Sequence, residues 1–127
     1  MKPGGGRSKG HNFERWVAIQ CRTIWPEAKR GLQGRGGAEA PDVDVPEWWI
    51  ECKVGGPAKD PVAALEQAEG DAAKSKDGRI PVAICKRDRC EPTATMRLEH
   101  VATRVGWGGA TPITMSFADW LWLARRF

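Results

Sequence analysis

The chain has 127 residues, a formal net charge of +4 at pH 7 and a pI near 9.1. This length predicts a single domain, at residues 11–127, preceded by a flexible basic arm at 1–10 that is rich in Gly, Lys and Arg. No stretch approaches the ~20 apolar residues of a transmembrane helix, and the start of the chain lacks the apolar core of a signal peptide. We therefore expect a cytoplasmic protein that does not enter a membrane.

The four cysteines predict free thiols in a reducing compartment. Cys21 and Cys52 fall on predicted apolar faces, where a free cysteine behaves as a small hydrophobic residue. Cys85 and Cys90, taken with His100, lack a CxxC pair and have the wrong spacing for a zinc ribbon. The sequence therefore gives little support to a zinc site.

The first regular element is predicted to be a helix. Asn12 is a suitable cap, and Pro26 stops the helix after about Trp25. One face of this helix is apolar and consists of Phe13, Trp16, Val17, Cys21 and Ile24. Glu14 lies at the edge of that face and could reach inward, although the helix dipole favours a glutamate in the first turn whatever its function.

A glycine-rich loop is predicted at 31–37, where successive N–H groups could cradle a phosphate. The loop lacks the GK[ST] ending of a P-loop, so we do not expect binding of a nucleotide triphosphate. The following residues predict a hairpin, with a short strand at 42–45, a tight turn at 46–47 and a return strand at 48–54.

This hairpin is predicted to bring charged side chains together. The two-residue period of a strand places Glu51 and Lys53 on one face, and the hairpin pairing brings Asp42 close to Glu51. Two carboxylates are a minimal hard-oxygen site for Mg²⁺, and an ammonium ~6.6 Å along the strand can orient an attacking water. Glu and Lys two residues apart are also common on a solvated sheet face, but here they interrupt an otherwise apolar run.

The middle of the chain predicts a helix followed by a buried strand. Asp60–Pro61 supplies a cap and a first-turn proline for a helix that reaches about Lys76. Its narrow packing face consists of Ala64, Leu65, Ala68 and Ala72. The strand follows at 80–86, and a helix between two strands implies a right-handed crossover and parallel pairing.

The last third predicts two short strands, at 95–98 and 113–115. Each precedes an apolar stretch that could turn helical. Ser116 and Asp119 resemble a capping box, which opens a final helix that runs to Arg126. The predicted elements together indicate an α/β fold.

The order of these motifs resembles the PD-(D/E)XK nuclease superfamily. The superfamily pattern is matched, in chain order, by Glu14, Pro41–Asp42, Glu51–Cys52–Lys53 and Gln67. Three segments within it resemble more narrowly the archaeal-type and phage-encoded Holliday-junction resolvases, namely 10–15, 34–37 and 49–53. The resemblance covers about residues 7 to 100 and implies a restriction-endonuclease-like αβββαβ core, with a mixed central sheet flanked by helices.

The resemblance also implies roles for individual residues. Asp42 and Glu51 would bind Mg²⁺, for which Mn²⁺ would substitute, and the backbone carbonyl of Cys52 would be a third ligand. Lys53 would position or help deprotonate the attacking water. Glu14 would complete the site, through a second metal or a water on the metal.

Two further residues fit the pattern less closely. Gln67 would orient Lys53 or the scissile phosphate, but on a helical wheel it falls about 60° outside the packing face marked by Ala64, which also fits a solvated side chain. Asp44 departs from the commonest pattern, which has one acid on this strand. It would be a spare ligand or a neighbour that raises the affinity of the site for cations.

The expected partner is DNA. Basic residues around the proposed entrance are candidates for phosphate contacts, with solvated surface charge as the alternative, and these are Arg7, Lys9, Arg15, Lys29, Arg30 and Arg35. The resemblance implies a Mg²⁺-dependent endonuclease of DNA recombination and repair, in a bacterial, archaeal or phage-infected cell, that resolves four-way junctions by paired nicks as a homodimer. Two alternatives stay open: a restriction-like, repair or packaging nuclease on duplex or flap DNA, and a non-catalytic DNA-binding module of the same fold.

Overall fold

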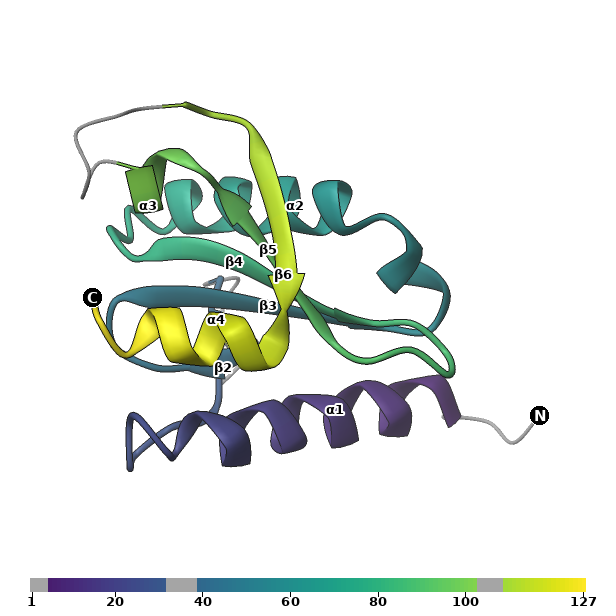
Figure 1. The fold of residues 1–127 in the computed structure, drawn as a ribbon. Helices are drawn as coiled ribbons and strands as arrows, with labels where there is room; N and C mark the ends of the chain where they lie inside the picture. The colour runs from purple at the N-terminus through teal and green to yellow at the C-terminus, as the bar shows by residue number, and fades with distance from the viewer. Residues whose placement is uncertain (1–4, 32–38, 103–108) are drawn as a thin grey trace.

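The computed structural model describes residues 5–31, 39–102 and 109–127, with side chains from Ser8 onward (Figure 1). The helices are α1 (Gly5–Cys21), α2 (Pro61–Lys74), α3 (Glu99–Ala102) and α4 (Phe117–Ala124), with a 3₁₀ helix, η1, at Gly56–Lys59. The strands are β1 (Lys29–Arg30), β2 (Val43–Asp44), β3 (Trp48–Val54), β4 (Ile80–Lys86), β5 (Thr93–Arg97) and β6 (Pro112–Ser116). The fold is therefore α/β, as the sequence predicts. None of the helices in these ranges is long and apolar enough to cross a membrane.

The six strands form one mixed sheet in the order β1-β2-β3-β4-β5-β6. β3 and β4 pair in parallel, from Trp48↔Ile80 to Val54↔Lys86, whereas the other neighbouring strands pair antiparallel. Since α2 connects β3 to β4, the parallel pairing predicted from a helix between two strands is confirmed.

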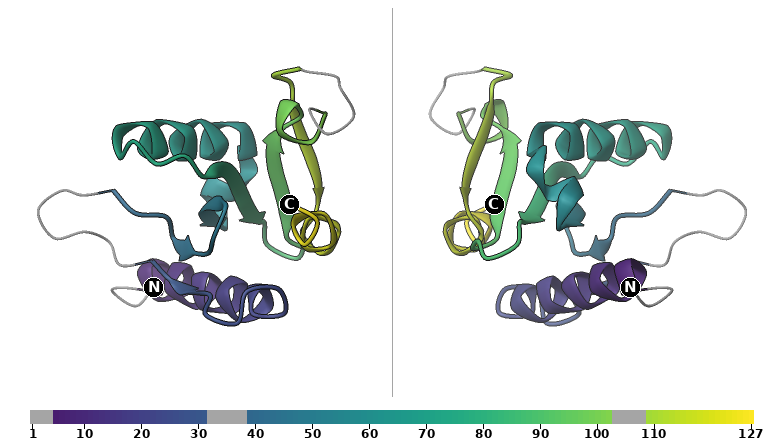
Figure 2. Two further views of the ribbon diagram at one scale, coloured as in Figure 1. Left: turned by 90° about the vertical axis from the view of Figure 1, so that its left-hand side faces the viewer. Right: turned by 90° about the vertical axis from the view of Figure 1, so that its right-hand side faces the viewer.

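Helices cover both faces of the sheet. Figure 2 shows α1 and α4 on one face and α2 on the other. The larger core lies under α1 and α4, and its strand residues include Trp48, Ile50, Cys52, Val82, Ile84, Ala94 and Met96. The odd-numbered residues of β3 and β4 face α2 instead, so Trp49, Ala83 and Cys85 pack on that side.

The α2 helix matches its prediction closely. The Asp60 side chain caps it by accepting a hydrogen bond from the Ala63 N–H at 3.0 Å. Its buried residues are those predicted, Ala64, Leu65, Ala68 and Ala72. Small side chains on this face let the helix lie close to the sheet, which brings α2 over the face that carries Glu51.

The α1 helix differs from its prediction at both ends. It begins at Gly5 rather than near Asn12, whose side chain accepts a hydrogen bond from Arg15 at 3.0 Å instead of capping the helix. Residues 5–10, predicted as part of a flexible arm, are helical, and Lys9 contacts Asp88 in the β4–β5 turn at 2.9 Å. The glycines of this segment gave no local sign of a helix, because the stabilising contact comes from a distant part of the chain.

One prediction about local packing needs correction, and one strand was missed. Trp16 was expected on the apolar face of α1 but is 40% exposed, with its ring beside Phe13 and Phe117 at centroid distances of 6.0 and 5.4 Å. The two-residue strand β1 was not predicted, because Lys and Arg have no pattern typical of a strand.

The four cysteines are free. Cys21 and Cys52 are buried as predicted, Cys85 is buried as well, and Cys90 is exposed. Burial raises the pKa of the Cys21 thiol to about 12 and that of Cys85 to about 11. These buried thiols are therefore protonated at neutral pH and unreactive.

Candidate functional site

The site begins with the alternation of side chains along β3. Glu51 lies on the α2 face and is 5% exposed, while its neighbours Ile50 and Cys52 belong to the core under α1 and α4. Lys53 lies on the same face as Glu51, with its Nζ atom 3.4 Å from Glu51 Oε1. The prediction that Glu51 and Lys53 share one face is confirmed.

Asp42 enters the site through the pairing of β2 with β3. Val43 lies opposite Ile50, and the Asp42 N–H donates to the Ile50 carbonyl at 2.8 Å. Asp42 itself lies directly before β2. Its carboxylate Oδ2 accepts a hydrogen bond from the N–H of Cys52, the residue after Glu51, at 2.8 Å, and its charge acts on Glu51, so the two acids lie close together.

The Cys52 backbone faces this pair of acids. Its N–H points toward Asp42, and the N–H and C=O of one strand residue leave the strand on the same side. The Cys52 carbonyl is therefore directed to the edge of β3 where Asp42 lies. This direction agrees with the predicted role of that carbonyl as a ligand beside the two carboxylates.

The two carboxyl groups hold an unfavourable excess of negative charge. The pKa of Asp42 is raised to about 6, chiefly by burial; the hydrogen bond from the Cys52 N–H opposes this rise, and the charge of Glu14 adds to it. Burial raises the pKa of Glu51 to about 7, with the charge of Asp42 as the next cause. A bound cation would relieve this repulsion, because it would favour the charged forms of both groups.

Glu14 lies close enough to this pair to influence it, as predicted for a residue at the edge of the α1 packing face. Its side chain is 16% exposed and accepts a hydrogen bond from Arg30 Nε at 3.0 Å. The charge of Glu14 raises the pKa of Asp42, and the charge of Arg30 lowers it. Arg30, predicted as a phosphate contact, is thus engaged by Glu14 in this structure.

One acid of α2 lies near the pair. Asp71 lies within electrostatic range, since its charge contributes to the raised pKa of Glu51. Gln67 is exposed and lies one helical turn before Asp71, and its predicted role beside Lys53 stays a prediction. Asp71 was not predicted, although a helical wheel sets it only about 20° from Ala64.

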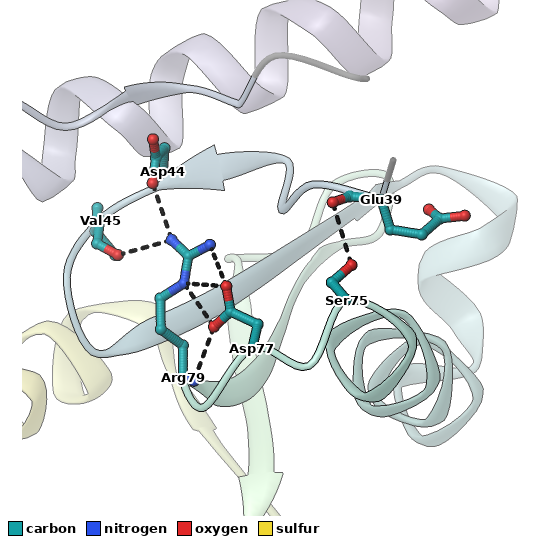
Figure 3. A network of polar contacts seen from close by, with 6 residues as sticks. All are labelled: Glu39, Asp44, Val45, Ser75, Asp77 and Arg79. Carbon is teal, nitrogen blue, oxygen red and sulfur yellow. Dashed lines mark hydrogen bonds and ion pairs between the residues drawn. The ribbon is translucent and has the colours of Figure 1, made fainter. Parts of the chain in front are cut away.

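Asp44 does not join the acid pair. It lies opposite Trp49 in the β2–β3 register, and its Oδ1 accepts a hydrogen bond from Arg79 Nη1 at 2.9 Å (Figure 3). Arg79 also contacts Asp77 through two nitrogens, and this contact lowers the pKa of Asp77. The prediction of Asp44 as a spare metal ligand is therefore wrong, because an arginine already neutralises this carboxylate.

The predicted phosphate contacts divide into engaged and exposed residues. Lys9 pairs with Asp88, and Arg30 pairs with Glu14. Arg15 and Lys29 are exposed. Arg35 and the side chain of Arg7 lie outside the described residues.

Two carboxylates, those of Asp42 and Glu51, are the side chains that could hold a metal ion here. No group of three or more His, Cys, Asp or Glu side chains within the described residues could hold a metal. Mg²⁺, however, is commonly bound by one or two carboxylates while it keeps several waters. Asp42, Glu51 and the Cys52 carbonyl satisfy this smaller requirement.

Cavities lie beside this site rather than in it. One of 670 Å³ and another of 210 Å³ share Lys29, Asp44 and Arg79 in their linings. The smaller cavity also reaches Pro41 and Trp49, which adjoin the acid pair along the chain. Neither Asp42 nor Glu51 lines these two cavities.

Comparisons with known proteins give no relative for this chain: no family model, curated protein or solved structure matches it. The resemblance drawn from the motifs therefore stays a prediction. Support for a function comes from the arrangement of the side chains.

Gly31 is expected to be essential for the placement of Asp42. A Cβ atom at position 31 would lie 1.7 Å from the Pro41 carbonyl oxygen, and the Gly31 N–H donates to the Asp42 carbonyl at 2.9 Å. A Gly31→Ala variant must move the segment that carries Asp42, so we expect it to lose about 1–3 kcal/mol of unfolding free energy and to bind Mn²⁺ more weakly. Urea unfolding and a Mn²⁺ titration would measure both.

Gly70→Ala is the matched control. A Cβ at position 70 meets no atom within 4 Å, and the residue lies inside α2, so alanine is expected to stabilise the protein by about 0.5–1 kcal/mol. A Gly31→Ala variant as stable as the parent would contradict the close approach of Gly31 to Pro41.

Proposed function

We propose that the protein is a metal-dependent DNA endonuclease. One observation carries the proposal: the Asp42 carboxylate accepts a hydrogen bond from the Cys52 N–H, next to Glu51, and Lys53 Nζ lies 3.4 Å from Glu51 Oε1. The order α1-β1-β2-β3-α2-β4 supports the proposal further, because it agrees with the restriction-endonuclease-like αβββαβ core implied by the motifs.

Each residue would have a distinct task. Asp42 and Glu51 would hold Mg²⁺ together with the Cys52 carbonyl, and the bound ion would supply Lewis-acid stabilisation of the charge that develops on the phosphate. Lys53 would orient the attacking water through its ammonium group, whose positive charge would favour the hydroxide left when that water loses its proton to solvent. Glu14 would hold a further water at the edge of the site.

DNA is the proposed substrate because of the charge distribution. The chain carries a formal net charge of +4, and exposed Arg15 and Lys29 lie on the two segments that flank the acid pair, α1 and β1. Cationic side chains around an acidic catalytic centre would attract the phosphate backbone without regard to base sequence.

Four-way junctions are the proposed substrate within this class, cut by paired nicks across a symmetric homodimer. The resolvase-like segments 10–15 and 49–53 support this choice, and a two-fold axis would place two sites across a branch. Linear duplex and flap DNA are the substrates of the alternative nucleases. All three would use the same side chains for hydrolysis.

A cleavage assay tests the proposal. Labelled four-way junction, flap and linear duplex would be incubated with the protein in Mg²⁺ or EDTA, and we expect paired symmetric nicks in the junction with Mg²⁺ only. Lys53→Ala is expected to slow cleavage by about 10²–10⁴-fold, because it removes the group that orients the water. Lys74→Ala, at an exposed position of α2, is the control and should cut at the parent rate. Equal rates for the Lys53→Ala variant and the parent would refute the assignment of the site.

A non-catalytic DNA-binding module is the second candidate. The ion pairs favour it, since Lys53 contacts Glu51 at 3.4 Å and Arg30 contacts Glu14 at 3.0 Å. Such pairing can neutralise the acids without a metal. DNA binding that is unaffected by EDTA, with no cut in any of the three substrates, would establish this candidate in place of the nuclease.

A further inference from the structure

The strands beside Asp42 are very short. β2 consists of Val43–Asp44 only, and β1 beside it is equally short. Two-residue strands supply few ladder hydrogen bonds, so side-chain contacts must contribute to the position of the segment that carries Asp42. Besides the hydrogen bonds of Asp42 with β3 and Gly31, side chains from the connection between α2 and β4 contact this segment.

Arg79 lies at the start of β4 and reaches β2. Its Nη1 donates to Asp44 Oδ1 at 2.9 Å and to the Val45 carbonyl at 3.2 Å. Its Nη2 donates to Asp77 Oδ2 at 2.8 Å (Figure 3). The guanidinium carbon also lies 5.4 Å from the centre of the Trp49 ring. Planar arginine groups with several fixed donors are well suited to such a three-way contact.

Arg79 contacts β2 and β3 close to the two acids. Asp44 and Trp49 form a cross-strand pair, and each lies two residues along the chain from one of the acids, Asp42 and Glu51. Arg79 contacts both members of that neighbouring pair. A change in the distance between β2 and β3 at this level would be passed directly to the two acids, because each acid lies only two residues from a member of that pair.

Ser75 supplies a second contact on the other side of Asp42. Its hydroxyl donates to the Glu39 carbonyl at 3.3 Å, and Figure 3 shows this contact and the Arg79 cluster at opposite ends of the segment. Residues 39–45 are thus held on both sides of Asp42 by residues 75–79, which follow α2.

We infer that Arg79, assisted by Ser75, is a positioning residue that holds Asp42 close to Glu51 and so sets the affinity of the site for a divalent cation. The inference rests on the proposed function for its cation, but the placement of Asp42 can be measured without it. Arg79 touches neither substrate nor metal in this assignment; it acts through the β2 segment. Groups that orient metal ligands in this way typically contribute about 10–100-fold to metal affinity or activity.

The test uses Arg79→Gln with Arg97→Gln as a matched control. Arg97 makes a comparable two-nitrogen contact with Glu69, at 2.8 and 2.9 Å, and joins α2 to β5 on the side of the helix away from Asp42. Arg97→Gln loses one ion pair, with Glu69, whereas Arg79→Gln loses two, with Asp44 and Asp77. The unfolding free energy of both variants is therefore measured by urea unfolding, and a purely structural role would make the changes in Cys52 exchange and Mn²⁺ binding follow the loss of stability in both.

Two readouts separate a positioning role from a structural one. The Cys52 N–H donates to the Asp42 carboxylate, so its hydrogen exchange, followed by NMR, reports where that carboxylate lies. We expect this amide to exchange about tenfold faster in Arg79→Gln than in Arg97→Gln. We expect the Mn²⁺ concentration for half-maximal binding to rise about tenfold in Arg79→Gln only.

The outcomes are distinct. Equal exchange rates of the Cys52 amide and equal Mn²⁺ binding in the two variants would overturn the inference. Arg79 would then only stabilise the connection between α2 and β4. If the parent neither binds Mn²⁺ nor cuts DNA, the proposed function fails, and the Cys52 exchange rates alone decide whether Arg79 positions Asp42. Should Arg79→Gln not fold, Ser75→Ala and Asp44→Asn each remove one exposed contact, and we expect the same changes at about two- to threefold.

Discussion

Asp42→Asn and Glu51→Gln are each expected to abolish cleavage while leaving DNA binding intact. Each substitution removes one of the two carboxylates that would hold the divalent ion. The ion contributes several kcal/mol to stabilisation of the transition state, which corresponds to a loss of roughly 10³-fold or more in rate. Binding should persist or tighten, because a carboxylate that faces phosphate repels it. Single-turnover cleavage and an electrophoretic binding assay on the same labelled junction would measure both.

Glu66→Gln is the matched control for this experiment, since it makes the same chemical change at an exposed position of α2. It should cut and bind as the parent does. A Glu51→Gln variant that retains full activity would remove the central assumption of the proposed mechanism. Loss of DNA binding together with cleavage would instead indicate that the acids support the fold of the binding surface.

The double variant Asp42→Asn/Glu51→Gln is expected to be more stable than the parent above pH 7, by on the order of 3 kcal/mol. The pKa of Asp42 rises from 3.8 to about 6 on folding, and that of Glu51 rises from 4.5 to about 7. Between about pH 4 and 7 the folded state therefore binds more protons than the unfolded state, so these two groups lower the unfolding free energy as the pH rises. Below pH 4 both states are protonated and the difference should vanish.

Urea unfolding of both proteins from pH 4 to 8 would measure this difference. Other carboxyl groups, such as Asp77, have a lowered pKa and act in the opposite direction, but they are common to both proteins and cancel. Saturating Mg²⁺ should stabilise the parent at pH 8 and have no effect on the double variant. A difference that grows toward low pH would show that the acids are not desolvated in the way the structure indicates.

The sequence was informative where local patterns and tertiary packing agree. The two-residue alternation of β3 predicted which face carries Glu51 and Lys53, because the intervening side chains are apolar and must enter the core. The Ser116 cap of α4 was predicted by its spacing from Asp119, and its hydroxyl accepts the Asp119 N–H at 3.0 Å. In each case neighbours in the chain determine the structure.

Other features depend on residues far apart in the chain and left no local signal. Arg79 and Asp44 are 35 positions apart, so neither residue's surroundings in the sequence reveal their contact. The start of α1 was misplaced for the same reason, since Lys9 meets Asp88 across 79 positions. Asp71, by contrast, does have a local signal, because a helical wheel sets it beside the α2 packing face, from which its charge reaches Glu51.

The two acids lie on one short hairpin, whereas Glu14 belongs to a distant part of the chain. Asp42 and Glu51 are nine residues apart, and the chain between them turns at Glu47, which has a φ of 70°. Bringing together the ends of so short a loop has a small entropic cost compared with the 28 residues that separate Glu14 from Asp42. The acid pair therefore belongs to a local unit of the chain, and transient detachment of α1 would remove Glu14 from its neighbours while the two carboxylates stayed close together.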